Sequence, residues 1–183
     1  MRQRSDSGSR EIRDVLAEAW PVNEAINQLL IKHLDLEAWR AKAPGRNART
    51  IAALFAHLHN IRLKWLRLSA PHLKRPAKLD RARCTRREAS AALAESAHRC
   101  SEMLAEALSG SGGQARRFLR DGWAKPWPAG AAMVVYMISH EAHHRGQACM
   151  LAHQLGCPLP GKLTSEMWNW ERLWKQCGFT HPR

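Results

Sequence analysis

The chain has 183 residues, 45% of them hydrophobic, and a formal net charge of +13. This length and hydrophobic content predict one folded domain over residues 1–183 and exclude disorder over most of the chain. No run approaches the roughly 18 consecutive apolar residues of a membrane span. The charged residues 1–8 predict a flexible tail and not a secretory signal, and five cysteines without a C-x-x-C pair are typical of free thiols in the cytoplasm.

Apolar residues recur at helical spacing through most of the chain, and strand patterns are almost absent. The first helix is expected from Ser9 to Leu34, with a kink or a short break at Pro21. Thr50 is a suitable N-cap for a second helix, which is expected to end near Leu68.

The helical pattern continues in the second half of the chain. Thr85 and Glu88 have the spacing of a capping box, which predicts a third helix over residues 85–108. Pro128 is expected in the first turn of a fourth helix over residues 128–155, and a short helix over residues 164–176 follows. Four long helices joined by loops predict an all-α protein, a four-helix bundle with a short C-terminal helix outside it.

The positive charge is concentrated in one segment, from Arg40 to Arg87. This segment holds 14 Lys and Arg residues and one acidic residue, Asp80. Such a charge attracts anions, either a phosphorylated or carboxylated small molecule, nucleic acid, or an acidic partner. A solvated surface has the same composition, and no recognition helix or zinc finger accompanies the segment.

Three histidines on two predicted helices have the spacing of metal ligands. His140 and His144 are four residues apart and therefore project from the same face of the fourth helix. His57 falls in the apolar stripe of the second helix, whereas His59, about 200° further around and beside Arg62, is expected to point outward. Metal sites in helical bundles are built from side chains on facing helices. The stripe consists of Leu54, Leu58, Ile61, Trp65 and Leu68.

The segments around these histidines resemble the DinB-like family of four-helix-bundle proteins. The resemblance is carried by residues 51–66 and by the run His140 to Gln147, which is followed by residues 155–160. It implies an up-down-down-up bundle, a homodimer, and a zinc or nickel ion. By position, the ligands would be His57, His140 and His144, although the neighbouring His59 and His143 leave the choice open. Some members of this family transfer low-molecular-weight thiols or isomerise small acids with a thiol cofactor.

Residues 140–144 also match H-E-x-x-H, the zinc-peptidase pattern in which the glutamate is the general base. The extended form of that pattern fails after His144, and no strand is predicted that would bind a peptide, although Glu166 or Glu171 is available as a distant ligand. Glu141 is therefore a weak catalytic candidate, with a solvated helix residue as the simpler interpretation. Gln147 is a second weak candidate, which would orient a bound water or bond to another helix.

Arg145 is the third weak candidate. It would hold an anionic substrate or form a surface salt bridge. Together the observations predict a metal-dependent enzyme that acts on a small, anionic substrate, with thiol-dependent S-transfer as the preferred reaction. The alternatives are a hydrolase that uses metal-activated water and a non-catalytic basic module that binds an anionic partner.

Overall fold

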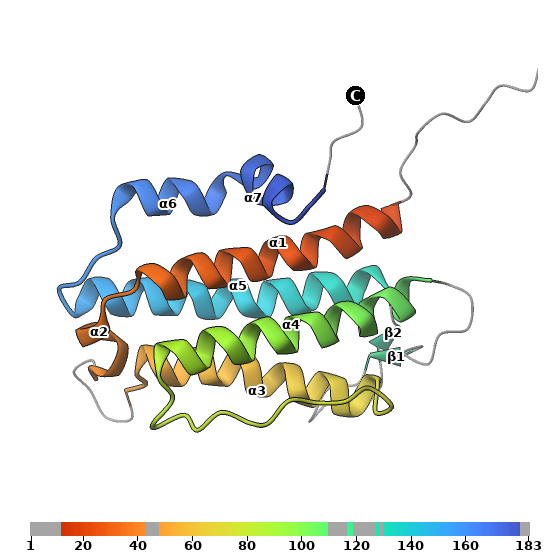
Figure 1. The fold of residues 1–183 in the computed structure, drawn as a ribbon, viewed down its shortest axis with the longest axis horizontal. Helices are drawn as coiled ribbons and strands as arrows, with labels where there is room; N and C mark the ends of the chain where they lie inside the picture. Colours follow the sequence, from red (N-terminus) through yellow and green to blue (C-terminus); the bar gives the residue numbers. More distant parts are fainter. Residues whose placement is uncertain (1–11, 43–47, 110–116, 119–126, 129, 180–183) are drawn as a thin grey trace, which may run out of the picture.

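Four long helices lie side by side and make up most of the protein (Figure 1). The computed structural model describes residues 12–42, 48–109, 117–118, 127–128 and 130–179. Within these residues the long helices are α1 (Ile12–His33), α3 (Ile51–Ser69), α4 (Arg86–Leu108) and α5 (Ala131–Gln154). The shorter elements are α2 (Leu36–Arg40), the paired strands β1 (Arg117–Phe118) and β2 (Trp127–Pro128), α6 (Gly161–Trp168) and α7 (Trp170–Gln176).

The directions of the long helices confirm the expected topology. Both α1 and α3 pack against α4 and α5, so α1 and α3 occupy opposite corners of the bundle. In Figure 1, α1 and α5 run from right to left, whereas α3 and α4 run from left to right. The order is therefore up-down-down-up. The parallel pair α3 and α4 is joined by residues 70–85, which return along α3 and are bonded to it at several points.

Short-range capping contacts explain where several helices begin. The Thr50 hydroxyl accepts a hydrogen bond from the amide of Ala53 at 3.0 Å, which confirms the predicted N-cap of α3. Thr85 and Glu88 form the predicted capping box, with each side chain bonded to the other residue's backbone amide. The unpredicted helix α2 begins after Asp35, whose carboxylate accepts from two amides of its first turn.

Two predicted boundaries are wrong, and of the kink or break expected at Pro21 no break occurs, since helix α1 continues through that residue. Pro128 is part of β2, and α5 begins three residues later, after Gly130, whose φ of 95° is a left-handed conformation that favours glycine. The expected C-terminal helix is two helices, because Asn169 ends α6 and then caps α7 by accepting from the amide of Arg172 at 3.1 Å. The predicted tail, residues 1–8, lies outside the described residues.

The core consists of two large apolar clusters with a polar layer between them. The first cluster includes Leu30, Leu58 and Leu93, and the second includes Trp20, Trp65 and Met137. On each long helix the polar residues fall between the two clusters in sequence. These polar residues are Asn23, Glu24 and Asn27 on α1, Arg62 on α3, Ser96 on α4 and Glu141 on α5, and all are buried.

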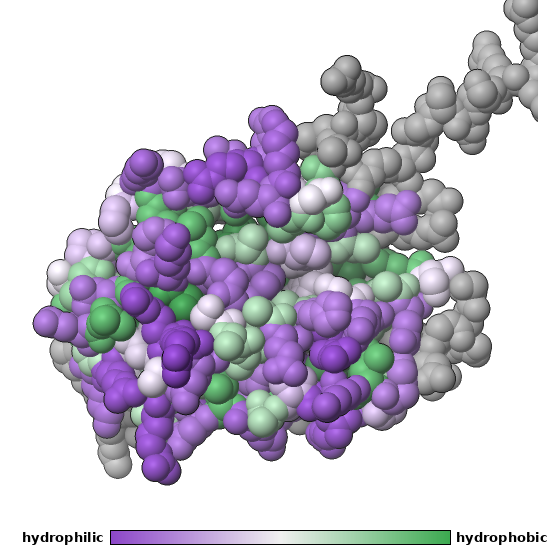
Figure 2. Space-filling view, viewed as in Figure 1, coloured by the Kyte–Doolittle hydropathy of each residue, from purple (hydrophilic) through white to green (hydrophobic). Residues whose placement is uncertain are grey.

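The C-terminal helices α6 and α7 lie outside the bundle, along α1 (Figure 1). Leu173 of α7 is buried with Val22 and Ile26 of α1 in a third, small cluster. The face seen in Figure 2 is mostly hydrophilic, with apolar side chains gathered along the boundary between α6 and the bundle. Among the described helices, none has both the length and the hydrophobicity that crossing a bilayer requires.

Candidate metal centre

The fold brings the three predicted histidines together. His57 projects from α3 toward α5, where His140 and His144 are one helical turn apart. The ring centroids of His57 and His144 are 4.6 Å apart, and those of His140 and His144 are 4.7 Å apart. One nitrogen from each ring lies within 4.8 Å of the others, which is close enough for a single ion. Among the described residues this group is the one cluster of His, Cys, Asp and Glu side chains with such geometry.

The surroundings of these rings favour the neutral form that metal binding requires. Burial, together with the positive charge of Arg81 and the neighbouring His144, lowers the pKa of His57 from 6.5 to about 3. Burial also lowers the pKa of His144, which is 7% exposed. The described group contains imidazoles and no carboxylate. Neutral imidazoles of this kind are ligands that zinc and nickel accept.

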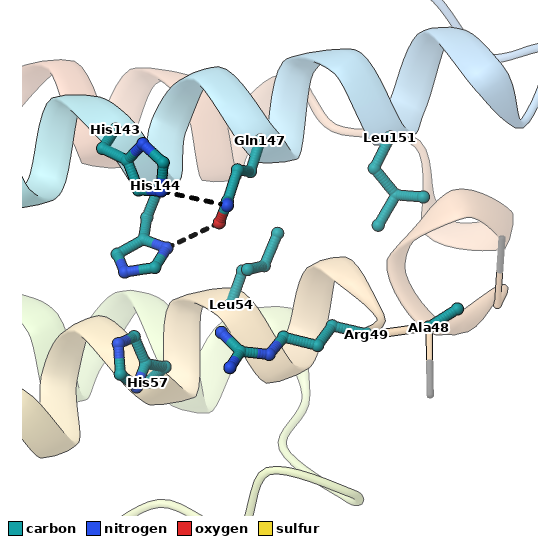
Figure 3. A pocket seen from close by; sticks show the side chains of 8 residues that line it. All are labelled: Ala48, Arg49, Leu54, His57, His143, His144, Gln147 and Leu151. Carbon is teal, nitrogen blue, oxygen red and sulfur yellow. Dashed lines mark hydrogen bonds between the residues drawn. The ribbon is translucent and has the colours of Figure 1, made fainter. Parts of the chain in front are cut away.

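Gln147 fixes the orientation of His144 (Figure 3). The amide oxygen of Gln147 lies 2.7 Å from Nδ1 of His144 and can only accept, so Nδ1 carries the proton. Nε2 of His144 therefore presents its lone pair to an ion. The amide nitrogen of Gln147 donates to Nε2 of His143 at 3.1 Å. Among the described residues, Gln147 thus bonds within its own helix and not to another helix. His143 is an exposed residue at the edge of the site.

A pocket of about 560 Å³ opens beside His57 and His144 (Figure 3). Leu54 and Leu151 supply apolar walls, and Arg49, just before α3, supplies a positive charge. A second cation, Arg81 in the connection after α3, donates to Nδ1 of His57 at 3.0 Å. The prediction of a basic segment did not single out these two arginines. The approach of Arg81 to His57 depends on the path of residues 70–85 along α3.

His59 does not point outward as expected. It is fully buried, and both ring nitrogens are in contact with polar groups. Nε2 donates to the carbonyl of Ala77 at 2.8 Å, and Nδ1 lies 3.1 Å from the hydroxyl of Ser96 on α4. His59 therefore joins α3 to α4 and to the connection between them, on the side of α3 away from the three-histidine group.

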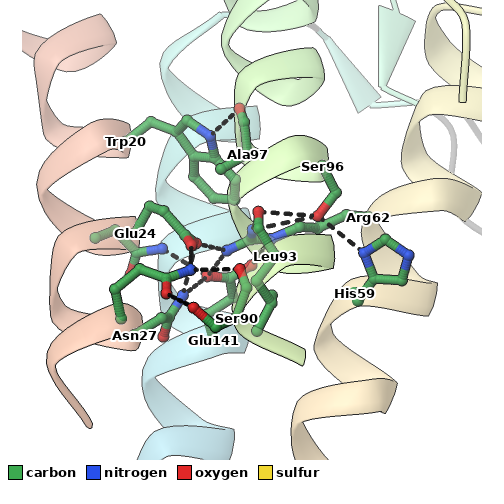
Figure 4. A network of polar contacts seen from close by, with 12 residues as sticks. Trp20, Glu24, Asn27, His59, Arg62, Ser90, Leu93, Ser96, Ala97 and Glu141 are labelled. Atoms are coloured by element: carbon green, nitrogen blue, oxygen red, sulfur yellow. Dashed lines mark hydrogen bonds and ion pairs between the residues drawn. The ribbon is translucent and has the colours of Figure 1, made fainter. Parts of the chain in front are cut away.

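Arg62 is the centre of a buried ion network in the polar layer (Figure 4). Its Nε donates to Oε1 of Glu141 at 2.6 Å, and its Nη2 donates to Oε2 of Glu141 at 2.8 Å and to Glu24 at 2.6 Å. Burial alone would lower the pKa of Arg62, but Glu141 and Glu24 raise it well above its ordinary value. The guanidinium is therefore charged, and it is fully buried, although the sequence pattern placed it outside.

Glu141 belongs to this network and is neither solvated nor available as a general base. Its side chain is 0% exposed. Oε2 accepts from Asn23 at 2.6 Å and from Asn27 at 2.8 Å in addition to Arg62. Burial acts to raise the pKa of Glu141, but Arg62 outweighs it, so the pKa is lower than usual. A carboxylate held in this way is a weak base without access to a bound water, which argues against the H-E-x-x-H interpretation.

Arg145 contacts neutral amides and not the acidic partner of the expected surface salt bridge. Its Nη1 donates to the side-chain oxygens of Asn23 at 2.6 Å and Asn27 at 3.0 Å. It therefore ties α5 to α1 through neutral amides instead of forming a surface salt bridge. It does not line the pocket beside His57 and His144.

The comparison with known families agrees with this geometry. The model of the DinB family matches residues 3–171. The chain belongs to the DinB family. DinB proteins bind metals, and the chain provides a histidine group that could hold a divalent ion. A search of curated proteins found no similar protein.

Proposed function

We propose that His57, His140 and His144 hold one zinc or nickel ion and that this DinB protein transfers a small thiol to a small substrate. The observation that supports the proposal is the meeting of three imidazoles from two facing helices beside a pocket of about 560 Å³. When bound, such an ion supplies an open coordination position and lowers the pKa of a thiol that occupies it. The preference for a thiol comes from the family resemblance.

The side chains around the ligands have distinct roles in this proposal. Gln147 keeps the proton of His144 on Nδ1 and so leaves Nε2 unprotonated. Arg81 has the opposite effect on His57, since a guanidinium that donates to Nδ1 leaves the ring proton on Nε2. His57 can therefore serve as a ligand only after Arg81 releases it. We infer that ion binding and the Arg81–His57 contact exclude each other.

The charge around the pocket supports an anionic substrate. Arg49 lines the pocket, and Arg81 contacts His57, which also lines it. A carboxylate or phosphate on the substrate would draw Arg81 away from His57 and pair with it bidentately. These arginines then orient the substrate, while Leu54 and Leu151 contact its apolar part. Homodimer formation and a cytoplasmic location, which the resemblance and the cysteine content indicate, stay predictions.

A hydrolase that uses metal-activated water is the main alternative. A general base near the site would assist such a reaction. Glu141 is bonded to Arg62 and is not available. Apart from the proposed ligands, the exposed His143 is then the candidate base among the described residues that line the pocket. The alternative of a basic binding module depends on the positive charge of residues 40–87. Arg62 is one of these charges, but it is fully buried and does not contribute to a binding surface.

The proposed reaction can be tested with a panel of low-molecular-weight thiols and electrophilic or ester substrates. We expect metal-dependent loss of free thiol. Its sulfur forms a thioether as halide leaves an alkyl halide, or a thioester as the alcohol leaves an ester, and no free acid is formed from the ester. The variant His144→Ala should lose this activity, whereas His153→Ala, an exposed histidine on the same helix, should keep it. Product release that needs the metal but no thiol would establish the hydrolase instead. Salt-sensitive retention on DNA that a chelator leaves unchanged would favour the binding module.

A further inference from the structure

A second cavity lies on the opposite side of α5 from the histidines. It has a volume of about 430 Å³, within the range of roughly 300–1,000 Å³ that is usual for small-molecule sites. Its walls come from α1, α5, α6 and α7, and they are mostly apolar, with Ile26, Ile138 and Met167 among them. Two tryptophans complete the lining: Trp168 is 77% exposed and Trp170 is 37% exposed. Large, exposed aromatic side chains next to an apolar cavity are typical of a binding site.

One charged group faces this apolar surface. Among the described residues that line the cavity, Arg145 alone carries a charge. Its Nη1 is bonded to Asn23 and Asn27, and the hydrogen bonds to other described residues involve no other nitrogen of this guanidinium. Nε and Nη2, which lie in one plane, thus remain for an anion, and a carboxylate fits this pair of nitrogens bidentately. The two asparagine contacts hold the guanidinium in place before a ligand arrives.

Gly146 provides an independent indication that the cavity is used. It occupies an exposed position inside α5, where glycine costs about 1 kcal/mol relative to alanine. A Cβ at this position would meet nothing within 4 Å, so the packing of the protein does not require glycine there. Because Gly146 lines the cavity, the missing side chain leaves more of its volume open.

We propose that this cavity binds a small aromatic carboxylate, with its ring against Trp168 and Trp170 and its carboxylate on Arg145. The site is separate from the three-histidine group, since the two share no lining residue. The proposal therefore does not depend on the metal or on the reaction at the other site.

The test uses 2-naphthoate and its neutral isostere 2-naphthamide as probes, with binding measured by isothermal titration calorimetry on the full chain. We expect 2-naphthoate to bind about tenfold or more tightly than 2-naphthamide, since the difference is a charge-assisted hydrogen bond. Ala142→Leu fills the cavity at an exposed position of α5 and should weaken 2-naphthoate binding at least as much. Ala94→Leu makes the same change at an exposed position of α4 and should leave binding unchanged.

Two further variants separate this site from the rest of the protein. Arg145→Gln should remove the preference for 2-naphthoate over 2-naphthamide, and the Ala142→Leu result decides the matter if Arg145→Gln fails to fold. His144→Ala should bind 2-naphthoate as the parent does. The proposal is wrong if 2-naphthoate produces no binding heat, if both probes bind equally, if Ala142→Leu binds normally, or if His144→Ala abolishes binding.

Discussion

Replacing Arg62 with methionine tests the role of the buried network. The substitution keeps most of the apolar stem but removes a guanidinium that bonds to Glu141 and Glu24 and also donates to the carbonyl of Leu93 at 2.8 Å. Glu141, which is 0% exposed, would then keep its charge with only two asparagine amides as partners. Breaking a buried pair by removing one partner costs about 3–5 kcal/mol, and we expect a loss of this size.

Glu141→Gln should be destabilising for a related reason. The described polar groups bonded to the two oxygens of Glu141 are all hydrogen-bond donors. In the glutamine variant one of these oxygens becomes an amide NH₂ group, which is itself a donor and faces another donor. In the double variant with Arg62→Met, the guanidinium and the charge of Glu141 are both removed, and Glu24 keeps the side-chain amide of Gln28 as a donor. The two losses should therefore not add, with a coupling energy of about 2 kcal/mol.

The assay is urea unfolding of the metal-free protein, followed by far-ultraviolet circular dichroism. Arg99→Met is the matched control, because Arg99 pairs with Glu102 at 3.0 Å but is 30% exposed, and it should cost less than about 1 kcal/mol. The loss caused by Arg62→Met should also shrink as the pH falls from neutral, because the unpaired, buried Glu141 carboxylate takes up a proton that the unfolded state does not hold. A loss no larger than that of Arg99→Met, or strict additivity in the double variant, would refute the network.

Three further predictions concern the metal centre and the fold. Gln147→Ala should weaken zinc binding about 10–100-fold in competition with a chromogenic chelator, since it orients His144; unchanged affinity would remove that role. Arg81→Ala should strengthen zinc binding about fivefold in the same competition, because the contact with His57 no longer has to be broken, and weaker binding would contradict the exclusion. Thr85→Ala should lower the free energy of unfolding by about 1 kcal/mol in urea titrations, and a neutral result would mean that the capping box contributes nothing.

The helical bundle could be predicted because the sequence features that specify its helices are local. Periodic apolar residues and capping side chains act within a few positions, and Thr50 and Thr85 begin their helices where the sequence indicates. Pro128 misled the prediction because proline is equally suited to the first turn of a helix and to a short edge strand. The break at Asn169 was missed because apolar periodicity continues across it, although asparagine is a common N-cap.

The histidine group was predictable for the same reason, whereas its surroundings were not. His140 and His144 share a helix face by spacing alone, and His57 lies in an apolar stripe. His59 and Arg62 were placed outside because one inward face was assumed for the second helix. In a four-helix bundle each helix contacts two neighbours. Because α3 packs against both α4 and α5, the buried part of its circumference is wider than the single apolar stripe.

The partners of Glu141 could not be read from the sequence. Arg62 is 79 residues away from it, and Asn23 is 118 residues away, so the contacts depend on which helices are neighbours. The position of Arg62 in the sequence could have indicated that it is buried. Arg62 lies four residues after Leu58 and three before Trp65, on the edge of the apolar stripe. A charged residue at such a position indicates a buried partner of opposite charge.

The most direct test of the metal centre is elemental analysis of protein purified without a histidine tag and then equilibrated with zinc or nickel. The account predicts one ion per chain in the parent and in His153→Ala, and almost none in His144→Ala. A folded His144→Ala variant that retains one ion per chain, or a folded parent that binds none, would contradict it.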